Sequence, residues 1–299
     1  MGKMYDALQK VEREKFTEPQ EDAPKATPED IVLDNKLVTF FEPSSMVAEQ
    51  FKRLRTFIIK PWMDDKSPKT ILVTSAFAEE GKSLIAVNLA ITIAIDLQSH
   101  ALLVDCDLRN PSLSRMFGLQ EEKGLSNYLM GDAEIPELLI KTPVDKLSIL
   151  PGGGLQDNPV ELIGSNKMKS LVQDLKSRYE DRYIIIDSSP ILATTEPSVI
   201  NKMVDGIILV IRSGETPRES VQQAMKMLEK DKILGVVLNN LEFKTEAMIR
   251  RYFGTKRYYY DYRYSKKHPE PGAMGKFAAL AGDMKMFLSK LRPGKKEDL

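Results

Sequence analysis

The sequence predicts an α/β fold with a mostly parallel sheet flanked by helices. Six short apolar runs alternate with stretches of helical spacing, and they cover residues 70–75, 101–106, 147–150, 183–187, 206–211 and 233–238. Runs of this length that are apolar on both faces are typical of buried parallel strands, whose crossover connections are helices. A loop that ends in Gly-Lys-Ser follows the first run and precedes a helical stretch, an order that suits polyphosphate binding.

The composition bounds the kind of protein that this chain can form. The 299 residues are 42% apolar, enough for one large core with appendages. The 43 basic and 43 acidic residues cancel, which argues against a general affinity for nucleic acid. One cysteine excludes an internal disulfide and two histidines leave little for a Cys/His metal site, as expected of a cytoplasmic protein. We expect no signal peptide and no membrane span, because no apolar stretch is long enough.

Two elements of different character precede the predicted sheet. Residues 1–42 are expected to form a short amphipathic helix near residues 2–16 and then a Pro-rich acidic linker. The globular domain begins at Pro43, where a Ser pair can cap a helix that ends before Pro61. The apolar face predicted for this helix carries Val47, Phe51, Leu54 and Ile58.

The first candidate site is the loop between the first strand and its helix. The residues expected to bind nucleotide are Ala76, Phe77, Ala78, Glu79, Glu80, Gly81, Lys82 and Ser83. In such a loop, backbone N–H groups surround the phosphates, Lys82 neutralises the β- and γ-phosphates, and the Ser83 hydroxyl ligates magnesium. Ala76 replaces the usual first glycine, and Glu79 and Glu80 put negative charge beside an anion site. The alternative is a chance Gly-Lys-Ser at a helix start.

Two further strands end in carboxylates. Asp105 and Asp107 follow the second strand, and Asp187 ends the fourth. Alternation predicts Asp105 and Asp107 on the same side of the chain, at the sheet edge where α/β proteins bind ligands. Two carboxylates there can hold Mg²⁺ and accept a hydroxyl proton, and Asp187 suits a water-mediated contact with the metal. A lone strand-terminal aspartate is usually a cap or loop residue, but three such motifs in this order favour the functional interpretation.

Six of the ten tyrosines lie within thirteen residues, and they are Tyr252, Tyr258, Tyr259, Tyr260, Tyr262 and Tyr264. They belong to a basic tail, residues 244–299, that ends in a predicted amphipathic helix at 274–291. Beside motifs for phosphoryl transfer from ATP, these tyrosines are candidate phosphoacceptors of the chain's own activity. The alternative is an aromatic and basic tail that stacks on single-stranded nucleic acid or supports a partner interface.

Together, these motifs resemble those of the bacterial tyrosine kinases of capsule and exopolysaccharide systems, whose ATPase domain has a deviant P-loop NTPase fold. The similarity covers approximately residues 49–240, where GLSNYLMGD and LPGGGLQDNPVELI also look like family segments. The resemblance implies a tyrosine kinase domain at 43–243 that uses ATP and Mg²⁺. It also implies regulation of polysaccharide synthesis or export. We expect transfer of phosphate to the tyrosine cluster of a neighbouring protomer, because the basic segment at 250–267 can approach the ATP phosphates and carboxylates of a neighbour's site.

The same resemblance assigns roles to individual residues. Lys82, Asp105 and Asp107 are the implied catalytic residues, with Asp105 as the base. Ser83, Asp107 and Asp187 are the implied metal ligands.

An oligomerisation motif is suggested by Glu49, Lys52 and Arg55, which are similar to the family's Glu-x-x-Arg-x-x-Arg motif, with Lys52 in place of the first arginine. Ordinary Glu-Arg pairs on a surface helix are the alternative. The resemblance implies a homo-oligomer, a membrane-embedded activator of the polysaccharide co-polymerase type, a cognate phosphatase and no nucleic acid. A cytoplasmic chain would then reach the inner face of the membrane through its activator.

Two other functions stay open at this point. A partition- or division-site type ATPase shares this fold and dimerises on ATP. Such proteins carry a lysine five residues before the P-loop lysine, and Phe77 occupies that position here. The third possibility is an inactive nucleotide-binding regulator, with Ala76, Glu79 and Glu80 as signs of lost activity. Formation of phosphotyrosine in Mg-ATP distinguishes the three.

Overall fold

The computed structural model describes residues 33–59, 67–119, 123–178 and 181–241. The chain divides into two units, Met1–Glu242 and Phe243–Leu299, and every described residue belongs to the first. The predicted helix near residues 2–16, the tyrosine cluster and the predicted helix at 274–291 lie outside the described residues.

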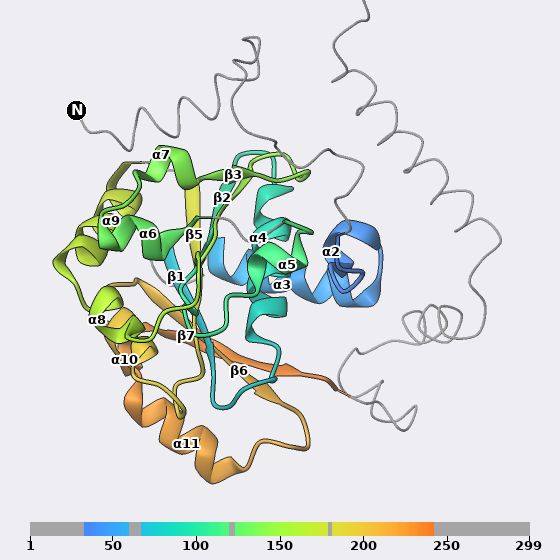
Figure 1. Ribbon diagram of the computed structural model, residues 1–299. Helices are drawn as coiled ribbons and strands as arrows, with labels where there is room; N and C mark the ends of the chain where they lie inside the picture. The colour runs from blue at the N-terminus through green and yellow to red at the C-terminus, as the bar shows by residue number, and fades with distance from the viewer. Residues whose placement is uncertain (1–32, 60–66, 120–122, 179–180, 242–299) are drawn as a thin grey trace, which may run out of the picture. The chain divides into compact units, whose positions relative to one another are not determined.

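A seven-stranded sheet forms the centre of the first unit (Figure 1). Its strands are β1 (Thr70–Ser75), β2 (His100–Asp105), β3 (Ile140–Lys141), β4 (Leu147–Leu150), β5 (Arg182–Asp187), β6 (Gly206–Arg212) and β7 (Ile233–Asn239). They lie in the order β3-β4-β2-β5-β1-β6-β7, and every neighbouring pair is parallel except β3 with β4. The predicted α/β fold with a mostly parallel sheet is therefore confirmed.

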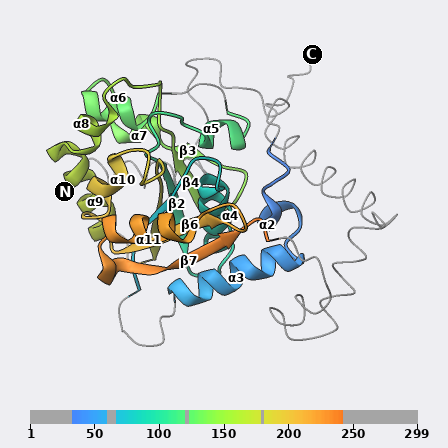
Figure 2. The ribbon, with the colours of Figure 1, turned by 90° about the horizontal axis from the view of Figure 1, so that it is seen from below.

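Helices cover both faces of this sheet (Figures 1 and 2). The described α-helices are α2 (Val38–Phe41), α3 (Met46–Ile59), α4 (Lys82–Ala94), α5 (Leu113–Met116), α6 (Leu125–Met130), α7 (Ile135–Leu138), α8 (Pro159–Ile163), α9 (Asn166–Arg178), α10 (Glu196–Ile200) and α11 (Arg218–Met227). A short 3₁₀ turn, η2 (Lys230–Lys232), precedes β7. Within the described ranges, no helix has the length and apolar character needed to cross a bilayer.

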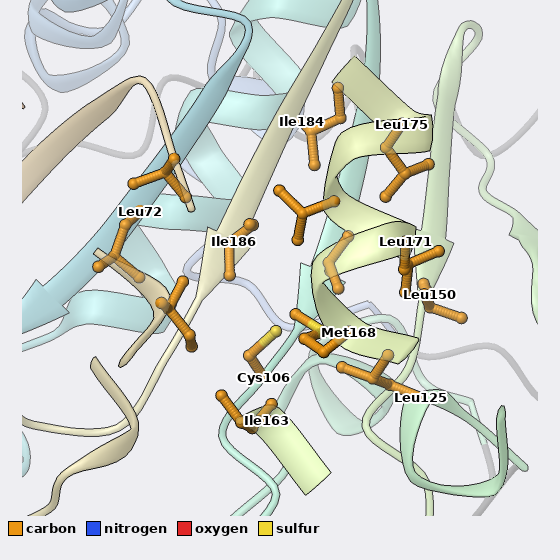
Figure 3. Packing of buried hydrophobic residues seen from close by; sticks show 14 of the residues in the cluster. Leu72, Cys106, Leu125, Leu150, Ile163, Met168, Leu171, Leu175, Ile184 and Ile186 are labelled. Atoms are coloured by element: carbon orange, nitrogen blue, oxygen red, sulfur yellow. The ribbon is translucent and has the colours of Figure 1, made fainter. Parts of the chain in front are cut away.

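The strands are apolar on both faces because each face packs on its own set of helices. In β1, Ile71 and Val73 belong to the core shared with α3 and α4, whereas Leu72 belongs to the core on the opposite face. Figure 3 shows the second core, to which α9 contributes Met168, Leu171 and Leu175 and β5 contributes Ile184 and Ile186. Burial of each such side chain stabilises the fold by roughly 1.5–3 kcal/mol.

The helix predicted after Pro43 is α3, and its N-terminus is capped as the Ser pair suggested. Ser45 Oγ accepts the Ala48 N–H at 3.1 Å. Phe51 and Ile58 are buried against α4, but Val47, which was expected on the same apolar face, is 50% exposed. Ala48, the next residue, is 1% exposed, so the buried face of the first turn lies one position further along the helix than predicted.

Two elements escaped the sequence analysis. β3 has two residues and pairs antiparallel with β4, so it is too short to show a pattern. The second is the stretch before Pro43, which was expected to be linker. There Leu37 is 1% exposed, and Thr39 donates its N–H to Asn88 Oδ1 of α4 at 3.0 Å. Asn88, a polar residue in an otherwise apolar helix, is the partner that holds this stretch.

Candidate functional site

The candidate residues meet at one edge of the sheet because β1, β2 and β5 end together. Asp187 lies opposite Val73 of β1 and opposite Asp105 of β2 in the strand register. Adjacent strands lie about 4.8 Å apart, so the ends of three strands and the loop after β1 share a small region. The structure thereby brings together Lys82, Asp105, Asp107 and Asp187, which are separated by up to 105 positions in the sequence.

The loop from Ala76 to Ser83 connects β1 to α4 with a tight backbone. Gly81, the N-cap residue of α4, has a left-handed backbone with φ of 91°, and Glu79 has φ of 63°. A Cβ atom on Gly81 would stand 2.2 Å from Asn239 Nδ2, so this position requires glycine on two grounds. Within the described part of the chain, no acceptor is found for the N–H groups of Lys82 and Ser83. Such free amides at a helix N-terminus are suited to an anion.

Lys82 lies close to the carboxylates of Asp105, Asp107 and Asp187. Its Nζ lies 2.7 Å from Asp107 Oδ2 and 3.2 Å from Ser83 Oγ, and its side chain is only 12% exposed. Burial alone would lower the pKa of Lys82, but the charges of Asp187, Asp107 and Asp105 outweigh it and hold the pKa above its ordinary value. The ammonium is therefore charged at neutral pH, as a phosphate ligand must be.

Asp105 is fully buried and its carboxylate organises the loop that follows β2. Oδ1 accepts the Asp107 N–H at 3.1 Å, and Oδ2 accepts the N–H groups of Ser112 at 2.9 Å and Leu113 at 3.1 Å. Burial and the nearby charge of Asp187 raise the pKa of Asp105 to about 7, against the opposing effect of these amide donors. A carboxylate with this pKa can take up a proton near neutral pH.

Asp187 is the buried carboxylate that the described residues leave unsatisfied. Neither oxygen makes a hydrogen bond of ordinary geometry within the described part of the chain, although the residue is completely buried and the Ser83 hydroxyl and the Ser188 N–H lie nearby. Burial raises the pKa of Asp187 to about 6, and the neighbouring Lys82 charge and Ser83 hydroxyl oppose that rise. Unpaired buried carboxylate oxygens fit a hydrated cation.

No group of three or more His, Cys, Asp or Glu side chains in the described ranges is already arranged around a metal position. The implied ligand set of Ser83, Asp107 and Asp187 contains only two carboxylates. This donor set suits Mg²⁺, which commonly takes one or two carboxylates together with waters and substrate phosphates. The expected metal site therefore depends on bound nucleotide for the rest of its ligands.

The two glutamates of the loop differ in orientation, which the sequence could not show. Glu79 is exposed, whereas Glu80 is 3% exposed and turns into the protein. Glu80 Oε2 accepts the Phe77 N–H at 2.8 Å, and Oε1 accepts the hydroxyl of Thr216. Glu80 therefore repels a bound phosphate less than its position in the sequence suggests, because its carboxylate accepts hydrogen bonds on the far side of the loop.

An ion pair between the half-exposed Arg109 and the buried Glu196 was missed by the sequence analysis. Arg109 Nε lies 2.8 Å from Oε1 of Glu196, whose side chain is 2% exposed. Gly152 was also not singled out, yet a Cβ there would stand 3.1 Å from Pro111 and 3.5 Å from the carboxyl carbon of Asp105. The Pro-Gly-Gly-Gly sequence after β4 was a visible signal for this close approach, whereas nothing in the sequence pairs Arg109 with Glu196.

The three residues of the suggested oligomerisation motif lie on α3 and make contacts within the chain. Lys52 Nζ lies 3.3 Å from Glu49 Oε2, an ordinary pair one turn apart. Arg55 donates from Nη1 to the carbonyl of Thr92 at 3.1 Å and lies 3.9 Å from Asp96. Arg55 therefore joins α3 to the end of α4, and Lys52 remains half-exposed.

Comparisons with known proteins agree with this geometry. The ParA family model, described as NUBPL iron-transfer P-loop NTPase, matches residues 66–258. Tyrosine-protein kinase YwqD of Bacillus subtilis is 32% identical over 226 residues, which cover 75% of this chain and 93% of that protein. Tyrosine-protein kinase CpsD of Streptococcus agalactiae is 32% identical over 70% of this chain and 88% of its own length.

A solved structure extends the similarity to three dimensions. The crystal structure of the chimerical protein CapA2B2 superposes with a TM-score of 0.65 at 30% identity, over 71% of this chain and 93% of that one. The sequence similarity, the fold and the arrangement of Lys82 with Asp105, Asp107 and Asp187 thus all indicate the same family. The chain belongs to the family of bacterial protein-tyrosine kinases within the deviant P-loop ATPases.

Proposed function

We propose that this chain is an ATP-dependent protein-tyrosine autokinase that regulates capsule or exopolysaccharide synthesis and transfers the γ-phosphoryl group to its own C-terminal tyrosines. The observation that carries the proposal is the convergence of Lys82 with Asp105, Asp107 and Asp187 at one sheet edge, beside free amides of the P-loop. One cation among three carboxylates leaves a local excess of negative charge when all are ionised. A nucleotide-bound cation would offset that excess.

Binding is the task of the loop and Lys82. The amides of Lys82 and Ser83 and the ammonium of Lys82 would hold the β- and γ-phosphates, for which Lys82 must exchange Asp107 for phosphate. Mg²⁺, held through Ser83, Asp107 and Asp187, would supply neutralisation of the charge on the transferring phosphoryl group. Phosphoryl transfer has little covalent chemistry for the protein to perform, so positioning and charge stabilisation account for most of the acceleration.

In the transfer step, the tyrosine oxygen forms a bond to the γ-phosphorus as the bond to the β–γ bridging oxygen breaks, and ADP leaves. The phenolic proton passes to a carboxylate, for which we propose Asp105 because its pKa is raised to about 7. In the described geometry both oxygens of Asp105 accept backbone amides. Oδ2 accepts two amides but Oδ1 accepts only one, so Oδ1 keeps a lone pair that can receive the proton.

We propose that transfer occurs between protomers of a homo-oligomer. Residues 250–267 carry seven basic residues and one acidic residue, a net charge of +6. The carboxylates of the site attract such a segment. Each phosphotyrosine adds about −1.5 to −2, so six reverse the sign of the segment and favour its release. The unphosphorylated state should therefore favour the oligomer, and the filled cluster should favour dissociation.

Recruitment to the polysaccharide machinery is proposed to depend on a membrane protein. A cytoplasmic tail of a polysaccharide co-polymerase-type protein would bind and activate the kinase at the inner face of the membrane, and a cognate phosphatase would reset the cluster. The proposal rests on the family resemblance and on charge neutrality, since a chain with 43 basic and 43 acidic residues has no general attraction to anionic lipid. Phosphotyrosine formation measured with and without vesicles that contain such a protein tests this dependence.

The experiment that tests the function is incubation of the purified chain with Mg-ATP, followed by detection of phosphotyrosine. An autokinase becomes labelled without any added substrate, either alone or with vesicles that contain the activating membrane protein. A partition-type ATPase would release phosphate without label, and an inactive regulator would do neither. The description of the matching family model suggests an iron-transfer role. The single cysteine of this chain cannot supply the several thiolates that hold an iron–sulfur cluster, so the sequence does not support that role.

Transfer between protomers needs a mixture of two chains. One carries Lys82→Met and keeps its tyrosines, and the other is active but has all six tyrosines changed to Phe. Label on the first chain supports transfer in trans. Its absence, with the active chain able to label an added tyrosine peptide, would show that transfer is confined to one chain.

A further inference from the structure

The P-loop is joined to a turn that lies more than 130 positions later in the sequence. This turn, residues 213–217, connects β6 to α11. The carboxylate of Glu80 accepts three hydrogen bonds: from the Phe77 N–H at 2.8 Å, from the Arg212 N–H at 3.4 Å and from the Thr216 hydroxyl. The Thr216 hydroxyl in turn accepts the Arg212 N–H at 3.0 Å.

Two further bonds attach the loop backbone to the ends of β6 and β7. Arg212 donates from Nη1 to the Glu79 carbonyl at 3.4 Å, and Asn239 donates from Nδ2 to the Glu80 carbonyl at 2.9 Å. The loop is therefore bonded to β6, β7 and the turn at 213–217 through the Glu80 side chain and through its own backbone carbonyls. All of these partners lie on the side of β1 away from β5 and β2. Among the described residues, these are the hydrogen bonds that the loop makes with β6, β7 and the turn at 213–217.

The bond from the Phe77 N–H to Glu80 spans three residues within the loop and closes it on itself. It leaves the Lys82 and Ser83 amides without acceptors among the described residues, because the carboxylate is directed backwards and not toward the helix N-terminus. A buried carboxylate that lost these donors would be left unpaired, which is strongly unfavourable. The described conformation of the loop therefore depends on Glu80 being bonded to Thr216.

We propose that Glu80 is a positioning residue for nucleotide binding: its bond to Thr216 fixes the P-loop to the β6–α11 turn and holds the Lys82 and Ser83 amides in the geometry that receives phosphate. The inference rests on the proposed function for its biological meaning, but its central claim concerns nucleotide affinity alone. It gives a structural purpose to a glutamate whose charge would otherwise oppose the binding of an anion.

The test compares two glutamates that are adjacent in sequence and opposite in orientation. Glu80→Gln and Glu79→Gln each remove one negative charge beside the phosphates. If charge alone mattered, both would tighten the binding of Mg-ADP. We expect Glu79→Gln to lower the Kd for Mg-ADP by about twofold to fivefold, as for a surface charge. Glu80→Gln should raise that Kd by about tenfold, because buried hydrogen bonds to a charged group are lost.

Two variants at Thr216 control for the possibility that Glu80→Gln fails to fold. Thr216→Val keeps the shape but removes the donor, and it should raise the Kd for Mg-ADP as Glu80→Gln does. Thr216→Ser keeps the hydroxyl, so its Kd for Mg-ADP should be close to that of the wild type. Combining Glu80→Gln with Thr216→Val should raise the Kd by much less than the product of the two single effects, since both break the same bond.

The measurements are calorimetric titration with Mg-ADP and thermal melting without nucleotide. A lower melting temperature with an unchanged Kd for the folded fraction would reduce Glu80 to a purely structural residue and overturn the proposal. Tighter binding by Glu80→Gln would overturn it as well. A wild-type chain that binds Mg-ADP but forms no phosphotyrosine would contradict the proposed function and leave this test of Glu80 intact.

Discussion

Replacing Lys82 by Met tests whether its ammonium serves catalysis or only structure. The Nζ lies 2.7 Å from Asp107 Oδ2, with the two side chains 12% and 5% exposed. Removing the cation leaves Asp105, Asp107 and Asp187 together without their shared counter-charge. We expect phosphotyrosine formation to fall by at least about 10²- to 10³-fold, the usual effect of losing one preorganised group that stabilises transition-state charge.

The same substitution should also lower the free energy of unfolding in a pH-dependent way. Breaking a buried ion pair costs about 3–5 kcal/mol when the partner stays ionised. Burial raises the pKa of Asp187 to about 6 and that of Asp105 to about 7 in the folded protein, whereas unfolded carboxylates titrate near pH 4. Without Lys82 these groups take up protons more readily. The stability difference from wild type should therefore grow as the pH rises through about 6 to 7, where these two groups of the wild type lose their protons, and should be larger at pH 8 than at pH 5.

The assay follows transfer of radiolabel from ATP to purified protein, with chemical denaturation at pH 5 and pH 8 on the same samples. Lys169→Met, at an exposed position on α9, is the matched control and should behave as wild type. Near wild-type labelling by Lys82→Met would refute the catalytic assignment. An equal loss of stability at both pH values would refute the electrostatic account of the site.

Three further sets of substitutions test separate parts of the account. Asp105→Asn should abolish transfer while Asp107→Asn should mainly weaken metal-dependent nucleotide binding, and a Mg²⁺ titration of phosphotyrosine formation that is identical for both would contradict these roles. Gly81→Ala should abolish calorimetric Mg-ADP binding, because φ is 91° and the added Cβ meets Asn239 at 2.2 Å; adding Asn239→Ala should relieve only the contact. Burial alone would raise the pKa of Asp205, but donors from Lys176, Thr70 and Lys69 outweigh it and lower the pKa. Asp205→Asn should therefore reduce unfolding free energy by on the order of 1 kcal/mol at neutral pH, and the difference from wild type should disappear as the pH falls below about 4.

The sheet could be predicted because its central strands are buried on both faces, and the half-buried edge strand β7 has a similar apolar run. Each predicted apolar run became a strand, with limits shifted by at most one residue at either end. β3 could not be predicted, since two residues show no periodicity. The burial of Leu37 depends on Asn88 accepting a bond from Thr39, a partner 49 positions away that no local pattern reveals.

The candidate site was predictable in its residues and not in their contacts. The strand-terminal aspartates followed from the rule that parallel strands share a carboxyl edge. Alternation correctly grouped Asp105 with Asp107, but it could not show that Asp105 binds three amides while Asp107 holds Lys82. The orientation of Glu80 depends on Thr216, 136 positions away, so the sequence suggested a repulsive charge where the structure has a buried hydrogen-bond acceptor.

The central claim, that this chain phosphorylates its own tyrosine cluster, is tested most directly by mapping phosphate on the purified protein after incubation with Mg-ATP. Peptide mass spectrometry should place phosphate on tyrosines between residues 252 and 264. The chain in which these six tyrosines are Phe should remain unlabelled there while still phosphorylating an added tyrosine peptide. Phosphate found only outside this segment, or absent from a wild-type chain that binds Mg-ATP in the presence of the activating membrane protein, would contradict the account.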